Sequence, residues 1–265
     1  MRNRSNGAPM QWSDEAIVLS ARRMGENSGR IHLLTHEHGL HTGLDRGAFS
    51  KRQRGLYEPG NIIHARWQAR LAEHMGMLNS EMVQPTASLL MDNRLALSLL
   101  NAATAMIERG LVERDPQPQI HEQMRVLIAS LLHAQKAQWL MEYVRLEFSL
   151  LEHTGFGLDL SRCASTGQLH DLCYVSPRTG RAVGRTAGEP YHDRLLALPA
   201  FLLDANHTEA SMEEYMQAIR LCGYFLIERL FMPRNITLPA ARIRLVELLT
   251  TQQLPKALPT AEIVI

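Results

Sequence analysis

Residues of catalytic type occur at three places in the sequence, and none of the three has the spacing of an enzyme site. Gly180–Thr186 is rich in glycine like a phosphate-binding loop, but it lacks the Gly-Lys-[Ser/Thr] ending. His121-Glu122 begins like a zinc-protease motif, yet Arg stands at position 125, where the second histidine is required. Glu213-Glu214 is explained by the start of a helix, where acidic side chains offset the helix dipole. We therefore expect no catalytic residue and no enzymatic activity.

Metal binding is the second chemistry that the residue types allow. The sequence has three cysteines, a sparse and odd set that argues against a disulfide framework. Cys163 and Cys173 lie ten positions apart, and neither is followed by the second cysteine of a Cys-x-x-Cys pair. His36 and His38 could share one strand face and bind a metal or a phosphate, but a hairpin with outward polar side chains explains them more simply. We expect no metal and no cofactor.

The distribution of charge favours an anionic partner for the N-terminal third of the chain. The whole chain has 28 Lys and Arg against 27 Asp and Glu, so its net charge of +1 makes no case for nucleic acid. Residues 1–80, however, carry eleven basic and seven acidic side chains, a net charge of +4, and the remainder carries −3. Most bases are Arg, which binds phosphate with two hydrogen bonds, although a GC-rich genome would also enrich Arg. The clustering, rather than the composition, points to nucleic acid.

A nucleic-acid site in this region would combine positive charge with aromatic rings on which bases stack. Ser50–Arg54 contains three bases without a neighbouring acid and is the strongest candidate for a phosphate-binding loop. Trp12 and Trp67 are further aromatic candidates, but the alternation around Trp67 places it in a core. The predicted DNA-binding residues are Arg22, Arg23, Arg46, Lys51, Arg52, Arg54, Arg66, Arg70, Phe49 and Tyr57.

Short apolar runs predict a β-rich domain over residues 12–83. The clearest strand is Ile63–Leu71, where apolar and polar residues alternate strictly. Its predicted inner face consists of Ile63, Ala65, Trp67, Ala69 and Leu71, and its outer face of His64, Arg66, Gln68 and Arg70. Four more strands are expected around 16–19, 31–34, 40–46 and 75–83. Five strands in about seventy residues fit an OB-type barrel, a fold that commonly binds single strands.

After position 84 the sequence changes to helical periodicity. Helices are expected at 87–109, 120–134, 136–154 and 239–250, and Ser211–Glu214 is a capping box that opens a helix ending at Pro233. The glycine-rich stretch 155–190 is expected to form an irregular lobe. The predicted organisation is a flexible tail at 1–11, an OB-type domain at 12–83, a helical domain in two parts at 84–154 and 191–250 around the lobe at 155–190, and a tail at 251–265.

The start of the chain is polar and lacks the apolar core of a signal peptide. No apolar run approaches the length that a membrane span needs. We therefore expect a cytoplasmic protein without a membrane partner.

Motifs in order along most of the chain resemble the RecO family of bacterial recombination mediators. The similar segments begin with the family's first strand and end in the insert of its proteobacterial members. One departure is Met24-Gly25-Glu26, where the family usually has an aromatic residue before Gly-Glu. The segments that carry the resemblance are Trp12–Leu19, Leu34–Gly39, Arg46–Ser50, Leu56–Asn61, Glu147–Leu160 and Tyr174–Val183.

The resemblance implies an α+β protein with a five-stranded N-terminal OB-fold barrel, an all-α helical domain and a small irregular zinc-ribbon-like insert. It implies binding of single- and double-stranded DNA and annealing of complementary strands. With RecR, such a protein would help RecA replace single-strand-binding protein during DNA repair, recombination and the DNA damage response (the RecFOR pathway), in association with the nucleoid. Some members hold zinc with four cysteines, but here Cys163 lacks the partners for a full set, so zinc is not expected.

The helical domain would also offer an apolar groove with a basic rim to the acidic C-terminal tail of single-strand-binding protein. Helix-surface solubility explains the candidate rim residues equally well, and they are Arg220, Arg229, Arg242 and Arg244. A different class of function stays open, an RNA-binding or protein-docking scaffold that uses the barrel. A comparison of DNA with RNA annealing would separate these two. A hydrolase within 155–190 would require turnover that no residue set in the sequence supports.

Overall fold

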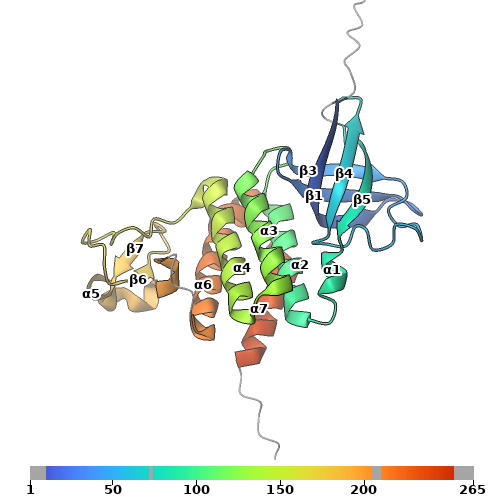
Figure 1. The fold of residues 1–265 in the computed structure, drawn as a ribbon. Coiled ribbons are helices and arrows are strands. Elements are labelled where there is room, and N and C mark those ends of the chain that lie inside the picture. The colour runs from blue at the N-terminus through green and yellow to red at the C-terminus, as the bar shows by residue number, and fades with distance from the viewer. Residues whose placement is uncertain (1–9, 72–73, 205–209, 254–265) are drawn as a thin grey trace, which may run out of the picture.

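The computed structural model describes residues 10–71, 74–204 and 210–253. Its N-terminal part is a five-stranded barrel that closes in the order β1-β2-β3-β5-β4 (Figure 1). Neighbouring strands are antiparallel except β3 and β5, which meet in parallel at Leu44 and Met77. The strands are β1 (Met10–Arg23), β2 (Gly29–Thr35), β3 (Gly39–Asp45), β4 (Ile62–Ala69) and β5 (Met77–Gln84). The five predicted strands are thus present.

The start of β1 corrects the predicted N-terminal tail. Met10 and Gln11 pair with Ala69 and Gln68 of β4, so they belong to the barrel, whereas residues 1–9 lie outside the described part. β1 can pair with both β4 and β2 because a bulge after Val18 bends the strand.

Alternation along β4 fixes which side chains enter the barrel. Ile63, Ala65 and Trp67 are at most 2% exposed, as predicted. Leu71 is 47% exposed, so its predicted place on the inner face is wrong. β4 ends at Ala69, and past that point no strand geometry directs the side chain inward.

The barrel has a core of its own and also contributes side chains to the core of the helical domain. One set of buried side chains fills the barrel interior, including Val18, Ile31 and Ile63. Alternate residues of the same strands, such as Ile17 and Leu34, belong instead to the large core of the helical domain. One face of the barrel is therefore closed by helices, and only the remaining faces are available to a ligand.

The helical domain is built from three helices that follow the barrel and two from the end of the chain. These are α2 (Arg94–Gly110), α3 (Pro118–His133), α4 (Lys136–Leu151), α6 (Met212–Phe225) and α7 (Ala240–Gln253). Short irregular helical segments, η1 (Glu152–Phe156), η4 (Leu226–Phe231) and η5 (Met232–Arg234), extend α4 and α6. The predicted capping box at α6 is confirmed, since the Glu214 N–H donates to Ser211 Oγ at 3.2 Å and the Ser211 N–H donates to Glu214 Oε2 at 2.8 Å.

The predicted helix at 87–109 is in fact two helices. α1 (Thr86–Leu89) ends before a short break, and α2 begins at Arg94. The side chain of Asn93 accepts a hydrogen bond from the Ala96 N–H at 3.1 Å, which caps α2. Asn is among the strongest N-cap residues, and its extended backbone here starts a new helix rather than continuing one.

A small lobe lies on the opposite side of the helical bundle from the barrel (Figure 1). Its three-stranded sheet has the order β7-β6-β8, so the lobe extends beyond the predicted limit at 190. A relation of the lobe to zinc ribbons stays a prediction. Its elements are β6 (Leu172–Val175), β7 (Ala182–Gly184), α5 (Arg185–Gly188), η2 (Glu189–Arg194), β8 (Leu196–Ala197) and η3 (Ala200–Leu202).

The segment after α2 docks against the barrel at Gly39, which leads to a stability prediction. Gly39 has φ of +64°, and a Cβ there would lie 2.1 Å from the Asp115 carbonyl oxygen. We expect Gly39→Ala to destabilise the protein by several kcal/mol, because the clash is with backbone that cannot rotate away. Gly25→Ala is the matched control: φ is +85° but nothing lies within 4 Å, so the loss should be about 1 kcal/mol. If urea unfolding gave the same loss of stability for Gly39→Ala and Gly25→Ala, the docking of this segment against Gly39 would be contradicted.

Within the described residues, no helix combines the length and the apolar character needed to cross a membrane.

Candidate nucleic-acid interface

The loop between β3 and β4 carries the basic stretch, and its shape is held from below by Asp45. This carboxylate is 6% exposed and accepts hydrogen bonds from the Gly47 N–H and the Tyr57 hydroxyl, both at 2.6 Å. Ala48 and Leu56 are buried in the barrel core beneath the loop. The loop is therefore anchored at both ends, and its middle projects outward.

Lys51, Arg52 and Arg54 lie exposed on the outer side of this loop, as a phosphate-binding loop requires. Successive turns fold the loop over a groove of about 680 Å³ that runs to the outer face of β5. Arg52 and Arg54 line one wall of this groove, and Asn79 and Glu81 of β5 line the other. The basic wall thus comes from the stretch that the sequence singled out, while the opposite wall comes from β5, 27 positions further along the chain from Arg52 to Asn79.

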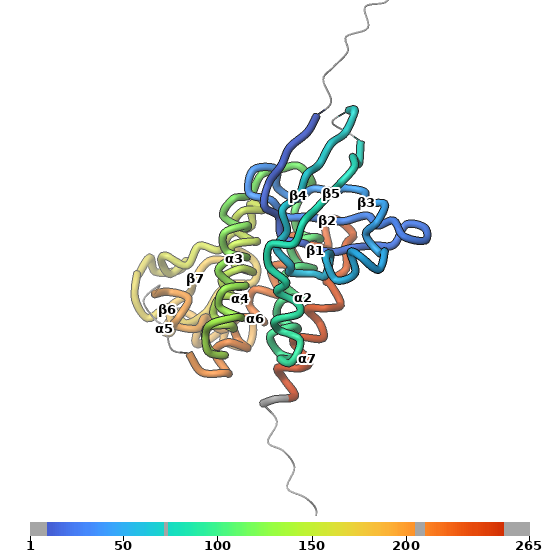
Figure 2. The backbone as a smooth tube through the Cα atoms, turned by 45° about the vertical axis from the view of Figure 1, so that its right-hand side comes forward, coloured from blue at the N-terminus to red at the C-terminus, as the bar shows by residue number. Residues whose placement is uncertain are grey.

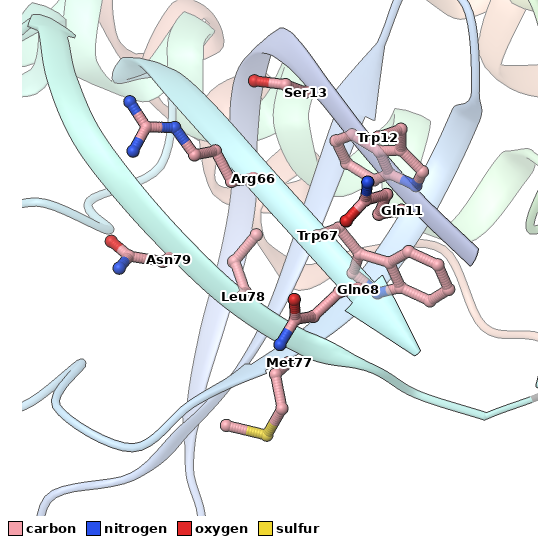
Figure 3. A pocket seen from close by; sticks show the side chains of 9 residues that line it. All are labelled: Gln11, Trp12, Ser13, Arg66, Trp67, Gln68, Met77, Leu78 and Asn79. Atoms are coloured by element: carbon pink, nitrogen blue, oxygen red, sulfur yellow. The ribbon is translucent and has the colours of Figure 1, made fainter. Parts of the chain in front are cut away.

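Two further grooves lie next to this one along β4 and β5, and the three are connected through shared lining residues. The central groove, about 700 Å³, shares Asn79 with the loop groove (Figure 3). It shares Gln68 and Met77 with a third groove of about 530 Å³, which Arg70 lines. We call these three connected grooves the trough.

The floor of the central groove is a polar patch of the barrel's outer face. Cross-strand pairing places Ser13, Arg66 and Asn79 in one row over β1, β4 and β5. Gln11 and Gln68 lie opposite one another in the next row. Figure 3 shows these side chains leaving neighbouring strands of the barrel. Amides and hydroxyls of this kind bind phosphate or base edges, but single polar residues within strands gave no signal in the sequence.

Four of the predicted DNA-binding residues therefore follow one path: Arg52 and Arg54 at one end, Arg66 in the middle and Arg70 at the other end. Arg66 lies 3.4 Å from Glu81, and both side chains are mostly exposed. Exposed pairs of this type contribute little, so the exchange of Glu81 for a phosphate costs little.

The remaining predicted bases lie elsewhere on the barrel. Arg22 donates to Glu108 of α2 at 2.7 Å, so it joins the barrel to the helices. Burial would raise the pKa of Glu108, but His32, Ser20 and Arg22 outweigh it, and the pKa is lowered. Arg23 stacks over the Phe49 ring at 4.5 Å, and Arg46 is exposed at the start of the loop.

Tyr57 is not placed as predicted. Its side chain is 5% exposed within the barrel core, and burial together with the Asp45 hydrogen bond raises its pKa well above the usual value. The ring therefore holds the loop in place and offers no face to a base. Phe49 is partly exposed, but Arg23 covers one face of its ring.

The residues proposed as a rim for an acidic tail do not form one set. Arg242 is 4% exposed and donates two hydrogen bonds to Glu147, at 2.6 and 2.9 Å, so its assignment to a rim is wrong. Arg229 stacks over Phe225 at 4.5 Å, and Arg220 lies 3.8 Å from Glu213. Arg244 is exposed on α7.

The lobe's cysteines do not fit a zinc ion. Cys163 Sγ is buried and accepts the Gly184 N–H at 3.3 Å. Burial would raise the pKa of this thiol, but hydrogen bonds from Thr166, Gly184 and Ser165 outweigh it and lower the pKa to about 7. Across the described residues, no three His, Cys, Asp or Glu side chains are placed to hold a metal. The hydrogen-bond donors around the Cys163 sulfur are backbone N–H groups and Thr166.

A group of rings closes one end of the barrel. Trp12 stacks on His38 with ring centroids 4.6 Å apart and on Trp67 at 5.9 Å, and His41 meets both indoles edge-on. Burial, Arg114 and His38 lower the pKa of His41 to about 4, against weaker opposition from Glu113 and the His38 backbone.

This histidine leads to a prediction about acid stability. The folded chain holds His41 at a pKa of about 4, whereas the unfolded chain restores about 6.5, so the unfolded state binds more protons between these values. We expect up to about 3 kcal/mol of stability to be lost as the pH falls from 6.5 to 4. Urea unfolding at several pH values measures it. In His41→Phe this part of the pH dependence should vanish, and an unchanged profile would contradict the account.

The fold and the trough together place the protein in a class in which a small barrel, supported by helices, carries an open binding surface. Here that surface is lined by arginines. Family models match both parts: "Recombination protein O N terminal" over residues 10–86 and "Recombination protein O C terminal" over residues 91–236. The chain belongs to the RecO family.

Three similar proteins are each named "DNA repair protein RecO". The protein of Rhodospirillum centenum is 47% identical over 240 residues, which cover 90% of this chain and 94% of that protein. The protein of Methylobacterium nodulans is 46% identical over 237 residues, covering 88% and 95%. The protein of Caulobacter sp. strain K31 is 45% identical over 239 residues, covering 90% and 97%.

Proposed function

We propose that this protein is a DNA repair and recombination mediator that binds single- and double-stranded DNA on its OB-type barrel and anneals complementary strands without enzymatic turnover. The observation that carries the proposal is the trough, because it aligns Arg52, Arg54, Arg66 and Arg70 along one open surface. Membership of a family whose members are named as DNA repair proteins supports the same conclusion.

The mechanism follows from electrostatics. Two complementary strands repel one another through their phosphates, and guanidinium groups that neutralise some phosphates lower this repulsion. An open trough leaves the base edges accessible, so a strand held by its backbone can pair with another. Because bound cations are released from DNA, binding should weaken steeply with salt.

The proposed partners are the C-terminal tail of single-strand-binding protein, RecR and, functionally, RecA, in the cytoplasm at the nucleoid. For the acidic tail, the helical domain has a groove of about 630 Å³ between α3, α4 and η3. Phe148 and Phe201 give it apolar walls, and Arg145 lies beside them. It contains none of the four arginines that the sequence suggested for this role.

Annealing of complementary fluorescent oligonucleotides tests the proposal, first as DNA and then as RNA, at low and moderate salt. We expect rapid, salt-sensitive DNA annealing and no consumption of nucleotide. Folded protein that anneals neither nucleic acid would turn attention to a protein-docking scaffold. A clear preference for RNA would replace DNA as the partner.

A further inference from the structure

A pocket of about 230 Å³ opens beside the trough at the ring-closed end of the barrel. Met10 lines this pocket and pairs with Ala69, which lines the third groove of the trough, so the pocket opens at the end of the sheet whose outer face carries the trough. Residues from the segment after α2 close its other side, so the pocket exists only where the barrel and the helical domain meet. Its lining consists of Met10, Trp12, Glu37, His38, His41, Trp67, Arg114 and Pro116.

The pocket contains buried nitrogens without hydrogen-bond partners. His41 is 6% exposed, and neither its Nδ1 nor its Nε2 makes a hydrogen bond of normal geometry, although the His38 backbone is near enough to raise its pKa. Trp12 Nε1 is also buried and unpaired. By contrast, Trp67 Nε1 donates to the carbonyls of Thr42 and Met75, at 3.1 and 2.8 Å. Buried polar groups are nearly always paired, so three such atoms in one pocket indicate a bound group that would pair with them.

The shape and the rings of the pocket limit what that group can be. His38, Trp12 and Trp67 form a stack of nearly parallel rings, with interplanar angles of 22° and 13°. The volume lies below the roughly 300–1,000 Å³ of pockets for drug-sized ligands, so it suits a single planar ring system. Neutral imidazole offers one donor and one acceptor, and indole offers a donor. A heteroaromatic ring with mixed polar edges meets all of these conditions.

We propose that this pocket binds one base of a DNA strand that lies in the trough. The base would stack on Trp12 in the position that half-buried His38 now occupies, with its polar edge toward His41. Arg114 would then neutralise an adjacent phosphate. This inference rests on the proposed function, since the strand must first bind in the trough.

Removal of the nitrogens from His41 tests the proposal, because DNA binding should weaken while the stability of the fold does not. In His41→Phe the unpaired nitrogens are lost while the ring remains. The free energy of unfolding at neutral pH should be unchanged or raised, whereas binding of single-stranded DNA should weaken about tenfold. His121→Phe is the matched control, because His121 is 4% exposed with both nitrogens unpaired but does not line this pocket.

The probes are an oligothymidylate and the same oligonucleotide with abasic sites, which keeps the phosphates but lacks bases. Wild type and His121→Phe should bind the thymidylate about tenfold more tightly than the abasic strand, and His41→Phe should bind both alike. Equal binding of both strands by wild type would overturn the pocket while leaving the trough intact. The pocket would also be overturned if His41→Phe still preferred the thymidylate to the abasic strand, or if this variant lost much of its stability. Binding of neither strand by wild type would overturn the proposed function itself, and the pocket with it.

Discussion

Replacement of Arg242 by Met is expected to destabilise the protein by about 3–5 kcal/mol, the usual cost of removing one partner from a buried ion pair. Arg242 joins three helices: from α7 it donates to Glu147 of α4 and, at 2.8 Å, to the Ile219 carbonyl of α6. The Tyr143 hydroxyl donates to the same carboxylate at 2.7 Å. Without Arg242, a carboxylate whose side chain is 1% exposed would keep only the uncharged donors Tyr143 and Cys222.

A double-mutant cycle separates the pair from simple loss of packing. In Glu147→Leu with Arg242→Met both charges are gone, and apolar side chains of similar size remain. We expect the double variant to regain much of the stability that the single variant loses, because no charge stays buried. Urea unfolding followed by far-ultraviolet circular dichroism gives the change in the free energy of unfolding for each single variant and for the double variant. If the stability lost in the double variant equalled the sum of the losses in the two single variants, the two buried charges would not be coupled.

Reversal of charge at the loop groove, with Arg52→Glu and Arg54→Glu together, is expected to weaken DNA binding by about a hundredfold at moderate salt. The variant removes two phosphate contacts and adds repulsion, and a charged hydrogen bond contributes about 1.5–3 kcal/mol. For single strands, the slope of log affinity against log salt should become shallower by about 1.4, since each contact contributes about 0.7. Fluorescence anisotropy of a labelled oligonucleotide measures both quantities.

The matched control changes the same charge in the lobe. Arg162 and Arg178 are both exposed, and the lobe lies on the far side of the bundle from the barrel (Figure 2). Arg162→Glu with Arg178→Glu should therefore keep most of the affinity and the salt slope of the wild type. If both double variants lost affinity equally, total charge rather than the trough would govern binding.

Local patterns in the sequence were enough to predict the barrel strands and most helices. The alternation around Ile63 and Trp67 reflects the geometry of a strand with one buried face, and the Ser211 capping box reflects local hydrogen bonds. The break at Asn93 was missed, because an Asn inside a Leu- and Ala-rich run only slightly weakens a helical pattern. The extended backbone that Asn93 adopts in the folded chain decides that the helix breaks there.

The site was predicted only in part, because its other half depends on contacts distant in sequence. The exposed run Lys51–Arg54 was visible as a charge pattern. Tyr57 is instead directed inward by Asp45, and Arg242 by Glu147, ninety-five residues earlier in the chain. An arginine that forms a buried ion pair has the same sequence signature as one on a helix surface. The trough's second wall and the pocket at Trp12 arise only when the barrel closes.

Photo-crosslinking tests the central claim, that the barrel carries the DNA, without altering the protein. A single-stranded oligonucleotide containing 4-thiothymidine would be bound, irradiated and mapped by mass spectrometry of the crosslinked peptides. Crosslinks should fall on the loop at 50–54 and on residues 66–70 and 74–82, which line the trough. Crosslinks confined to the helical domain and the lobe, within residues 86–204 and 210–253, would contradict the account and move the DNA to the other half of the molecule.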